Sequence, residues 1–152
     1  LDGFDTTAFF ARAEASFTVE RLDSSLDLSQ RWANAQPEQC IIGVAIPGSV
    51  YVLTAKDSGG KLDVLVLHEA VLDGLLGITE EAVREGKHLH YIRGLDTAIA
   101  EVEGGAAQIA LLLKPTSVQQ VADISFSGGV MPQKSTDFYP KLLSGLTIYK
   151  LG

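Results

Sequence analysis

The strongest constraint on the fold is a pair of β-rich segments that flank a turn dipeptide. Cys40–Ile46 and Ser49–Ala55 are rich in Ile, Val and other strand-favouring residues, and Pro47-Gly48 stands between them. A Pro-Gly pair in this position is typical of a hairpin, because Pro fixes the first turn residue and Gly accepts a positive φ at the second. The chain is therefore expected to fold around a sheet. Cys40 begins the first strand, so we expect it to be buried rather than nucleophilic.

The residues before the hairpin predict a helix, a strand and a second helix. Asp5 is placed to cap the first helix, whose apolar residues recur at spacing four through Phe17. An alternating pattern at 18–22 predicts a short strand, and the segment 27–35 predicts a helix. These elements and the hairpin make up an N-terminal lobe, 1–60.

The residues that follow the hairpin predict two more helices. Ser58-Gly59-Gly60 is the best candidate for a flexible boundary between lobes. The apolar stripe in 62–76 predicts a helix that ends at Gly77. Thr79 then opens a short acidic helix, and Gly86 closes it.

The second half of the chain alternates strand and helix patterns. The expected elements are strand, helix, strand and helix at 88–93, 96–103, 108–114 and 117–123. This βαβα pattern predicts a parallel pair of strands with a right-handed crossover, and hence a mixed sheet. A closing strand is expected at 146–149.

The predicted class is therefore α/β, in the mixed α+β sense. The hairpin-containing lobe, 1–60, precedes a second lobe, 61–152, with the βαβα unit and a C-terminal Pro/Lys loop. A single continuous domain is the alternative, since 152 residues fit one core or two small lobes.

The composition excludes several classes of protein. A net charge of −7 argues against a nucleic-acid partner, which requires a concentrated field of Lys and Arg. One cysteine permits no internal disulfide, and no Cys/His spacing suits a metal, so no metal site is expected. No apolar run is long enough for a membrane span. We expect a cytoplasmic protein, and the first residue, Leu1, favours a piece of a longer polypeptide with an upstream domain.

The segment Met131–Lys141 contains the residues best suited to binding an anion. Lys134, Ser135 and Thr136 supply an ammonium and two hydroxyls, and Lys141 adds a second charge. A P-loop is excluded, because the residue before Lys134 is not the glycine that the motif requires. The alternative is structural: the prolines shape a surface segment, the hydroxyls satisfy local backbone groups, and the lysines are solvated.

Three other positions are candidates. Arg93 ends a predicted strand, where ligands of open α/β sheets bind, although an ion pair with Asp96 is the alternative. His68 falls on or beside an apolar helix stripe, where it is either a hydrogen-bonded core residue or a polar site. His88 and His90 would share one strand face, without an identifiable third metal ligand.

The C-terminal segment resembles a known family. Met131-Pro-x-Lys-Ser-Thr-x-Phe-x-Pro-Lys141 with Ser144-Gly145-Leu146 is similar to the closing signature of the domain of unknown function 1015 family of bacteria and archaea. The similarity extends back through Tyr91-Ile-Arg93 and loosely to the hairpin. Gln133 and Asp137 depart from the family pattern, so the geometry of the loop is not carried over.

The resemblance implies an upstream domain with a ParB-like and free-serine-kinase-like motif, which this chain lacks, and it implies no specific reaction. Two functions follow. The first is an accessory anion- or nucleotide-binding domain of a larger cytoplasmic enzyme, with a phosphate-containing small molecule as ligand. The alternative is a non-catalytic module for interaction or homo-oligomerisation that packs on the upstream domain. The sequence identifies neither catalytic residues nor a cofactor.

Overall fold

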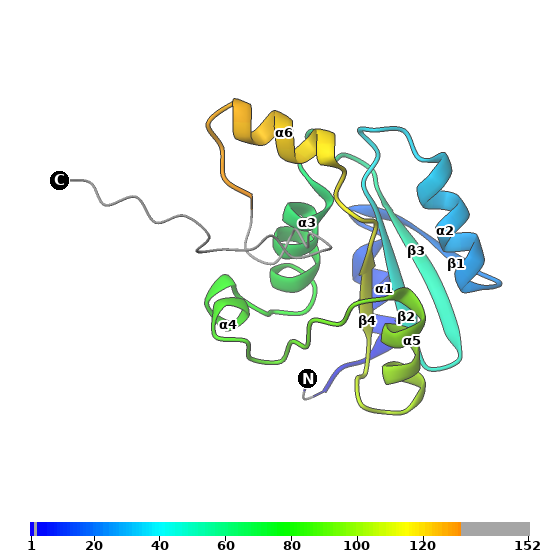
Figure 1. The fold of residues 1–152 in the computed structure, drawn as a ribbon. Helices are drawn as coiled ribbons and strands as arrows, with labels where there is room; N and C mark the ends of the chain where they lie inside the picture. The colour runs from blue at the N-terminus through cyan, green and yellow to red at the C-terminus, as the bar shows by residue number, and fades with distance from the viewer. Residues whose placement is uncertain (2, 132–152) are drawn as a thin grey trace, which may run out of the picture. The chain divides into compact units, whose positions relative to one another are not determined.

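Figure 1 shows the fold as a computed structural model, which describes residues 1 and 3–131. Residues 1–114 form one compact unit, and 115–152 belong to a second. Helices combine with a four-stranded sheet, so the expected mixed α/β class is confirmed. The Ser58–Gly60 connection lies within the first unit, where the Ser58 hydroxyl donates a hydrogen bond to the backbone oxygen of Glu38 at 3.1 Å.

The first helix, α1, spans Thr6–Ala13 and is capped as predicted. The Asp5 carboxylate accepts a hydrogen bond from the Ala8 amide at 2.7 Å. The rings of Phe4 and Phe9 lie 6.0 Å apart, in agreement with a hydrophobic contact across the cap. The prediction that Phe17 lies on this helix is wrong.

Phe17 begins the strand β1, Phe17–Leu22, because the chain turns after α1 and then pairs with the hairpin. The helix α2, Ser25–Asn34, follows with a capping box between Ser24 and Asp27. Its apolar face buries Leu28 completely. The predicted strand and helix are both confirmed.

The hairpin is confirmed and forms the centre of the sheet. Its strands are β2, Ile41–Ile46, and β3, Ser49–Ala55, and Gly48 between them has a φ of +74°. The strand order is β1-β3-β2-β4, and every pairing is antiparallel. The strand β4, Ala110–Leu113, pairs with β2.

The predicted helix at 62–76 has two parts. A short α-helix, α3, spans Asp63–Val66 and continues into a π-helix, η1, at Leu67–Asp73. The short acidic helix α4, Glu80–Arg84, is capped by the Thr79 hydroxyl, which accepts a hydrogen bond from the Ala82 amide at 3.3 Å. Both predicted helices are therefore present.

The predicted strand at 88–93 is wrong, and so is the parallel pair that depended on it. These residues have no regular structure, and β4 is antiparallel to β2. His88 has a left-handed φ of 62°, which interrupts an extended run at its first residue. Tyr91 and Ile92 are 57% and 38% exposed, so the alternating pattern is not matched by alternating burial.

The sheet has an apolar layer on each face, because successive strand residues point to opposite sides. One layer joins Ile42, Val44 and Leu53 to residues of α1 and η1. The other joins Ile41 and Val52 to α2 and to α5, which spans Leu95–Glu103. Leu112 of β4 packs in the second layer, and Leu111 and Leu113 pack against the first. The strand β4 therefore has apolar contacts on both faces.

Gly43 sets the distance between the sheet and α2. A Cβ atom at this position would lie 2.4 Å from Cδ2 of Leu28 and 3.1 Å from Cβ of Leu112. Only glycine lets the helix approach this closely without a shift of its neighbours.

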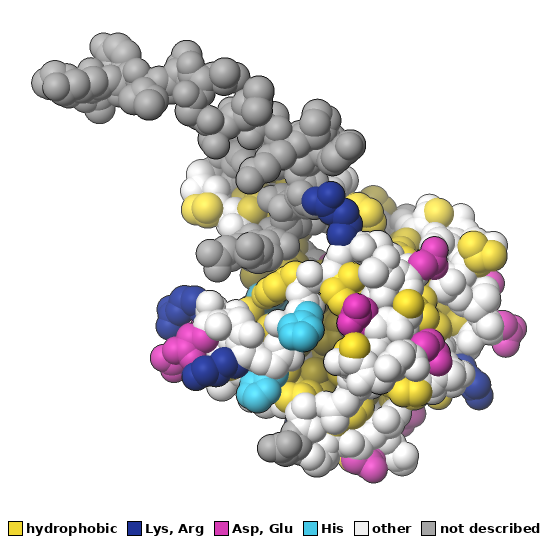
Figure 2. Space-filling model, turned by 60° about the horizontal axis from the view of Figure 1, so that its bottom comes forward, with side chains coloured by type: hydrophobic (Ala, Val, Ile, Leu, Met, Phe, Trp, Pro, Cys, Tyr) yellow, Lys and Arg dark blue, Asp and Glu magenta, His cyan; other side chains and the backbone are white. Residues whose placement is uncertain are grey.

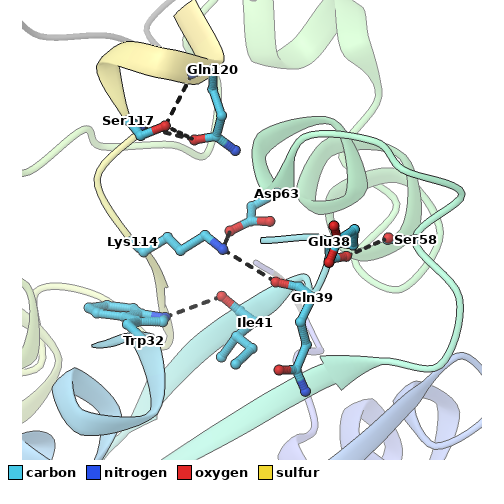
Figure 3. Close-up of polar contacts among 9 residues, drawn as sticks. All are labelled: Trp32, Glu38, Gln39, Ile41, Ser58, Asp63, Lys114, Ser117 and Gln120. Carbon is cyan, nitrogen blue, oxygen red and sulfur yellow. Dashed lines mark hydrogen bonds and ion pairs between the residues drawn. The ribbon is translucent and has the colours of Figure 1, made fainter. Parts of the chain in front are cut away.

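The second unit contains the helix α6, Val118–Phe126, among its described residues. The side chains of Ser117 and Gln120 form a capping box at its first turn (Figure 3). The helix predicted at 117–123 is thus confirmed. The closing strand expected at 146–149 lies outside the described residues.

Candidate functional site

The four residues expected to bind an anion lie outside the part of the chain that the structure describes. These are Lys134, Ser135, Thr136 and Lys141. Their role stays a prediction from the sequence. Of the residues predicted to bind an anion, Arg93 is the one that the structure describes.

Arg93 lies at the end of the irregular stretch that connects α4 to α5. It is exposed and precedes Gly94, the N-cap residue of α5, whose φ is +96°. The strand end that we expected at this position is absent. The position of Arg93 before a helix is instead set by the turn at Gly94, which positive φ makes favourable for glycine.

The residues from the end of α4 to Arg93 form an exposed basic stretch, which we call the 84–93 segment. It contains three Lys or Arg residues and one Glu, in a chain whose net charge is −7. Figure 2 shows histidine side chains on the surface, with both basic and acidic side chains near them. The exposed side chains of this segment that can donate a hydrogen bond to a ligand are those of Arg84, Lys87, His88, His90, Tyr91 and Arg93.

Lys87 and Glu85 form an ion pair within this segment. The Lys87 ammonium is 2.6 Å from the Glu85 carboxylate, and the two side chains are 65% and 46% exposed. An exposed pair of this kind contributes little to stability and exchanges readily for other partners. By residue count, Lys and Arg exceed Glu by two within the segment, and all three of its basic side chains are exposed.

His68 lies in η1 and is half-buried. Its chain neighbour Glu69 forms an ion pair with Lys61. The carboxylate of Glu69 is thus engaged elsewhere, in agreement with the helical geometry that points adjacent residues apart. A polar role for His68 stays a prediction.

A second group of residues is largely shielded from water, and the sequence reasoning missed it: Cys40 is 1% exposed, and the side chains of Asp63 and Lys114 are 13% and 19% exposed. Cys40 before β2, Asp63 at the start of α3 and Lys114 after β4 come together, and we call them the buried polar cluster. Figure 3 shows Lys114 between Asp63 and the backbone of Gln39. The Lys114 Nζ donates a hydrogen bond to the Gln39 oxygen at 3.3 Å.

The ion pair in this cluster is incompletely satisfied. The Lys114 Nζ lies 3.4 Å from Oδ2 of Asp63, and the two side chains are 19% and 13% exposed. That Oδ2 atom is itself shielded from solvent and has no hydrogen-bond partner. A buried carboxylate oxygen without a hydrogen bond carries much of the cost of its desolvation.

The surroundings in the cluster raise the pKa of both the Cys40 thiol and the Asp63 carboxyl group. Burial, together with the nearby Asp63 carboxylate, raises the pKa of the Cys40 thiol from 9.0 to about 12. Burial also raises the pKa of Asp63, and the positive charge of Lys114 only partly opposes this effect. At neutral pH Cys40 is therefore a protonated thiol, which is a poor nucleophile.

No short-range pattern in the sequence signals this cluster. Cys40, Asp63 and Lys114 are far apart along the chain, and each stands beside an apolar run. The one available signal is that Asp63 and Lys114 interrupt or end segments of buried-type residues, where a charge requires a partner. The sequence does not say which partner.

Comparisons with known proteins identify no relative. No family model, no curated protein and no solved structure matches this chain. Within the described residues, no group of three or more His, Cys, Asp or Glu side chains is placed to hold a metal ion. No helix in that same part of the chain has the length and apolar character needed to cross a membrane.

Proposed function

We propose that this chain is an accessory anion-binding domain of a larger enzyme, and that its ligand is a phosphate-containing small molecule. The observation that carries the proposal is the 84–93 segment, which is exposed and carries net positive charge on an otherwise acidic chain. A binding site depends on local charge rather than on the total. Lys134, Ser135 and Thr136 lie outside the described residues and are proposed from the sequence alone as donors to an anion.

The residue types in the segment suit a phosphate ester. Arg93 offers a planar fork of donors that matches phosphate oxygens, and Lys87 offers a point charge. Tyr91, which is 57% exposed, offers a flat apolar face beside these charges. This combination favours a nucleotide or a similar aromatic phosphate over inorganic phosphate alone.

Isothermal titration calorimetry with ATP, ADP, phosphoserine and pyrophosphate tests the proposal, on this chain and on the longer protein. We expect Arg93→Ala and Lys134→Ala each to weaken binding by about tenfold, the equivalent of one charge-assisted hydrogen bond. The matched control is Arg21→Ala, which removes an exposed arginine of β1. Unchanged affinity in Arg93→Ala and Lys134→Ala, or no binding to the longer protein, would contradict it.

A second candidate function, self-association, is favoured by the second unit. On and after α6, Val118, Phe126 and Val130 are 79%, 90% and 91% exposed. Exposed large apolar side chains mark interaction surfaces where they form a contiguous patch, so these three residues are the ones to test. We expect Phe126→Ser to shift a dimer towards monomer in sedimentation velocity, and a wild-type chain that stays monomeric at high concentration would rule this candidate out.

A further inference from the structure

The sheet ends on one side at β1, which has no further strand beside it among the described residues. The Lys56 amide donates a hydrogen bond to the Ser16 oxygen at 3.0 Å, one step beyond the first pair of the β1–β3 register. Bonded pairs alternate along an antiparallel ladder, so every second residue of β1 bonds to β3 and the residues between them face outwards. The outward-facing residues are Phe17, Val19 and Arg21.

The backbone of this edge lacks a partner along most of its length. In the described part of the chain, the N–H and C=O groups of Val19 and Arg21 make no backbone hydrogen bond outside the sheet. A row of donors and acceptors at this spacing is complementary to an extended polypeptide. The edge of β1 therefore suits a peptide backbone better than a small molecule.

A polar groove follows the same edge between β1 and α2, which lie side by side (Figure 1). Leu28 and Trp32 of α2 face the sheet, so the helix turns a polar side towards the groove. The groove is open to solvent and has a volume of about 330 Å³. The helical residues that line it are Asp27, Gln30, Arg31 and Asn34.

The charges around the edge favour a basic occupant. A second hollow of about 600 Å³ shares Arg21, Leu22 and Asp23 with the groove and is also lined by Glu103. The two hollows together are lined by four acidic and two basic residues, and the whole chain carries a charge of −7. Local charge and long-range field thus both attract a cationic segment.

We propose that the edge of β1 binds an extended, lysine- or arginine-rich segment of a partner protein, which adds to the sheet as an antiparallel strand. Its residues opposite Val19 and Arg21 bond to the edge, and the residues between them direct basic side chains towards Glu20 and the groove. No residue of the 84–93 segment lines either hollow, so this site goes beyond the proposed anion site.

A second copy of this chain is a poorer occupant of the same edge. Glu20 and Arg21 are exposed charged residues on β1, and charges on an edge strand oppose the pairing of two such edges. Two copies would also bring together two chains that each carry a charge of −7. The partner is therefore expected to be a different, basic chain.

Two capped peptides of six residues, the length of β1, test the proposal on the whole chain. The Lys-Val peptide, Lys-Val-Lys-Val-Lys-Thr, places its valines opposite Val19 and Arg21 and its lysines towards the groove. The Lys-Pro peptide, Lys-Pro-Lys-Pro-Lys-Thr, has the same charge but lacks the N–H groups that would pair with β1. We expect the Lys-Pro peptide, and an acidic analogue with Glu in place of each Lys, to bind about tenfold more weakly.

Amide hydrogen exchange, measured by NMR, shows whether the bound peptide pairs with the edge. We expect the Lys-Val peptide to slow exchange of the Val19 and Arg21 amides, whereas the Glu20 amide, which already bonds to β3, should change less. Attraction by charge alone would not produce this alternation. Exchange at Val19 and Arg21 should be unaffected by the Lys-Pro peptide.

A matched pair of variants removes one donor from the edge. Arg21→Ala and Arg21→Pro both lose the arginine side chain, but only Arg21→Pro also loses the outward N–H, and proline is tolerated on an edge strand where that group faces solvent. We expect Arg21→Pro to bind the Lys-Val peptide about fivefold more weakly than Arg21→Ala, the equivalent of one backbone hydrogen bond.

The proposal is overturned if the Lys-Val peptide does not bind, or if it binds without slowing exchange at Val19 and Arg21. Equal affinity for the Lys-Val and Lys-Pro peptides would also contradict it, because charge alone would then explain the binding. Protection of these amides in the free chain that rises with its concentration would assign the edge to a second copy instead. If Arg21→Pro does not fold, exchange in the wild type still decides the question.

Discussion

The buried polar cluster and the 84–93 segment contain the same kinds of side chain in opposite surroundings. In the cluster, Asp63 and Lys114 are 13% and 19% exposed, and burial shifts the acidity of Asp63 and Cys40. In the segment, Lys87 and its partner Glu85 are 65% and 46% exposed. Water stabilises each of these exposed charges, so neither depends on the other.

The difference shows where each group of charges can act. A largely buried charge has few possible partners, so loss of one partner leaves it unsatisfied. An exposed charge can exchange its partner for a ligand at little cost. The segment is therefore where we propose ligand binding, whereas the charges of the cluster are held within the fold.

The largest expected effect concerns the reactivity of Cys40. Its pKa of about 12, against 9.0 for an unperturbed thiol, lowers the thiolate fraction by about a thousandfold at pH 8. We expect alkylation by iodoacetamide to be slower by at least that factor in the folded chain than in the urea-unfolded chain. The label reports on this residue alone, since the chain has one cysteine. Equal rates would mean that the cluster is open to water.

The next effect concerns stability, and it has opposite signs for the two partners of the buried pair. Lys114→Met leaves Asp63 ionised without a counter-charge, so we expect a loss of about 3 kcal/mol in the free energy of unfolding at pH 7. Asp63→Asn removes the charge that burial disfavours, and Lys114 keeps its hydrogen bond to Gln39. This variant should be at least as stable as the wild type, by urea denaturation.

The sign of the pH dependence follows from the raised pKa of Asp63. Its contribution to stability is present in full below the unfolded-state pKa and is lost as the pH rises through the folded-state pKa. The difference in stability between Asp63→Asn and the wild type should therefore grow from acidic to neutral pH. If this stability difference became smaller from acidic to neutral pH, the ionised Asp63 would stabilise the fold, and burial would not be the dominant influence on it.

The smallest effect is expected at an exposed ion pair. Arg31 of α2 pairs with Glu20 of β1, and the two side chains are 50% and 48% exposed. We expect Arg31→Met to change the free energy of unfolding by less than about 0.5 kcal/mol, and added salt to reduce even this change. A loss as large as that of Lys114→Met would show that exposure does not separate the two classes of pair.

The elements of the first unit were predictable wherever one short segment contains its own signal. The hairpin needed only two β-rich runs and the Pro47-Gly48 turn, and α4 needed only Thr79 and its acidic first turn. The stretch at 88–93 has an equally clear alternation but no burial to match it. An alternating pattern forms a strand only where a neighbouring strand pairs with it and one of its faces is buried.

The candidate sites also differ in whether adjacent residues or tertiary contacts form them. The basic character of the 84–93 segment and the donor set at Lys134–Thr136 are properties of adjacent residues, so the sequence alone determined them. The pairing of Asp63 with Lys114 beside Cys40 was decided by the tertiary structure. The antiparallel order β1-β3-β2-β4 brings the start of β2 and the end of β4 to one end of the sheet, where α3 begins. Burial at that place raises the pKa of the carboxyl group and, together with the Asp63 carboxylate that the fold brings close, the pKa of the thiol.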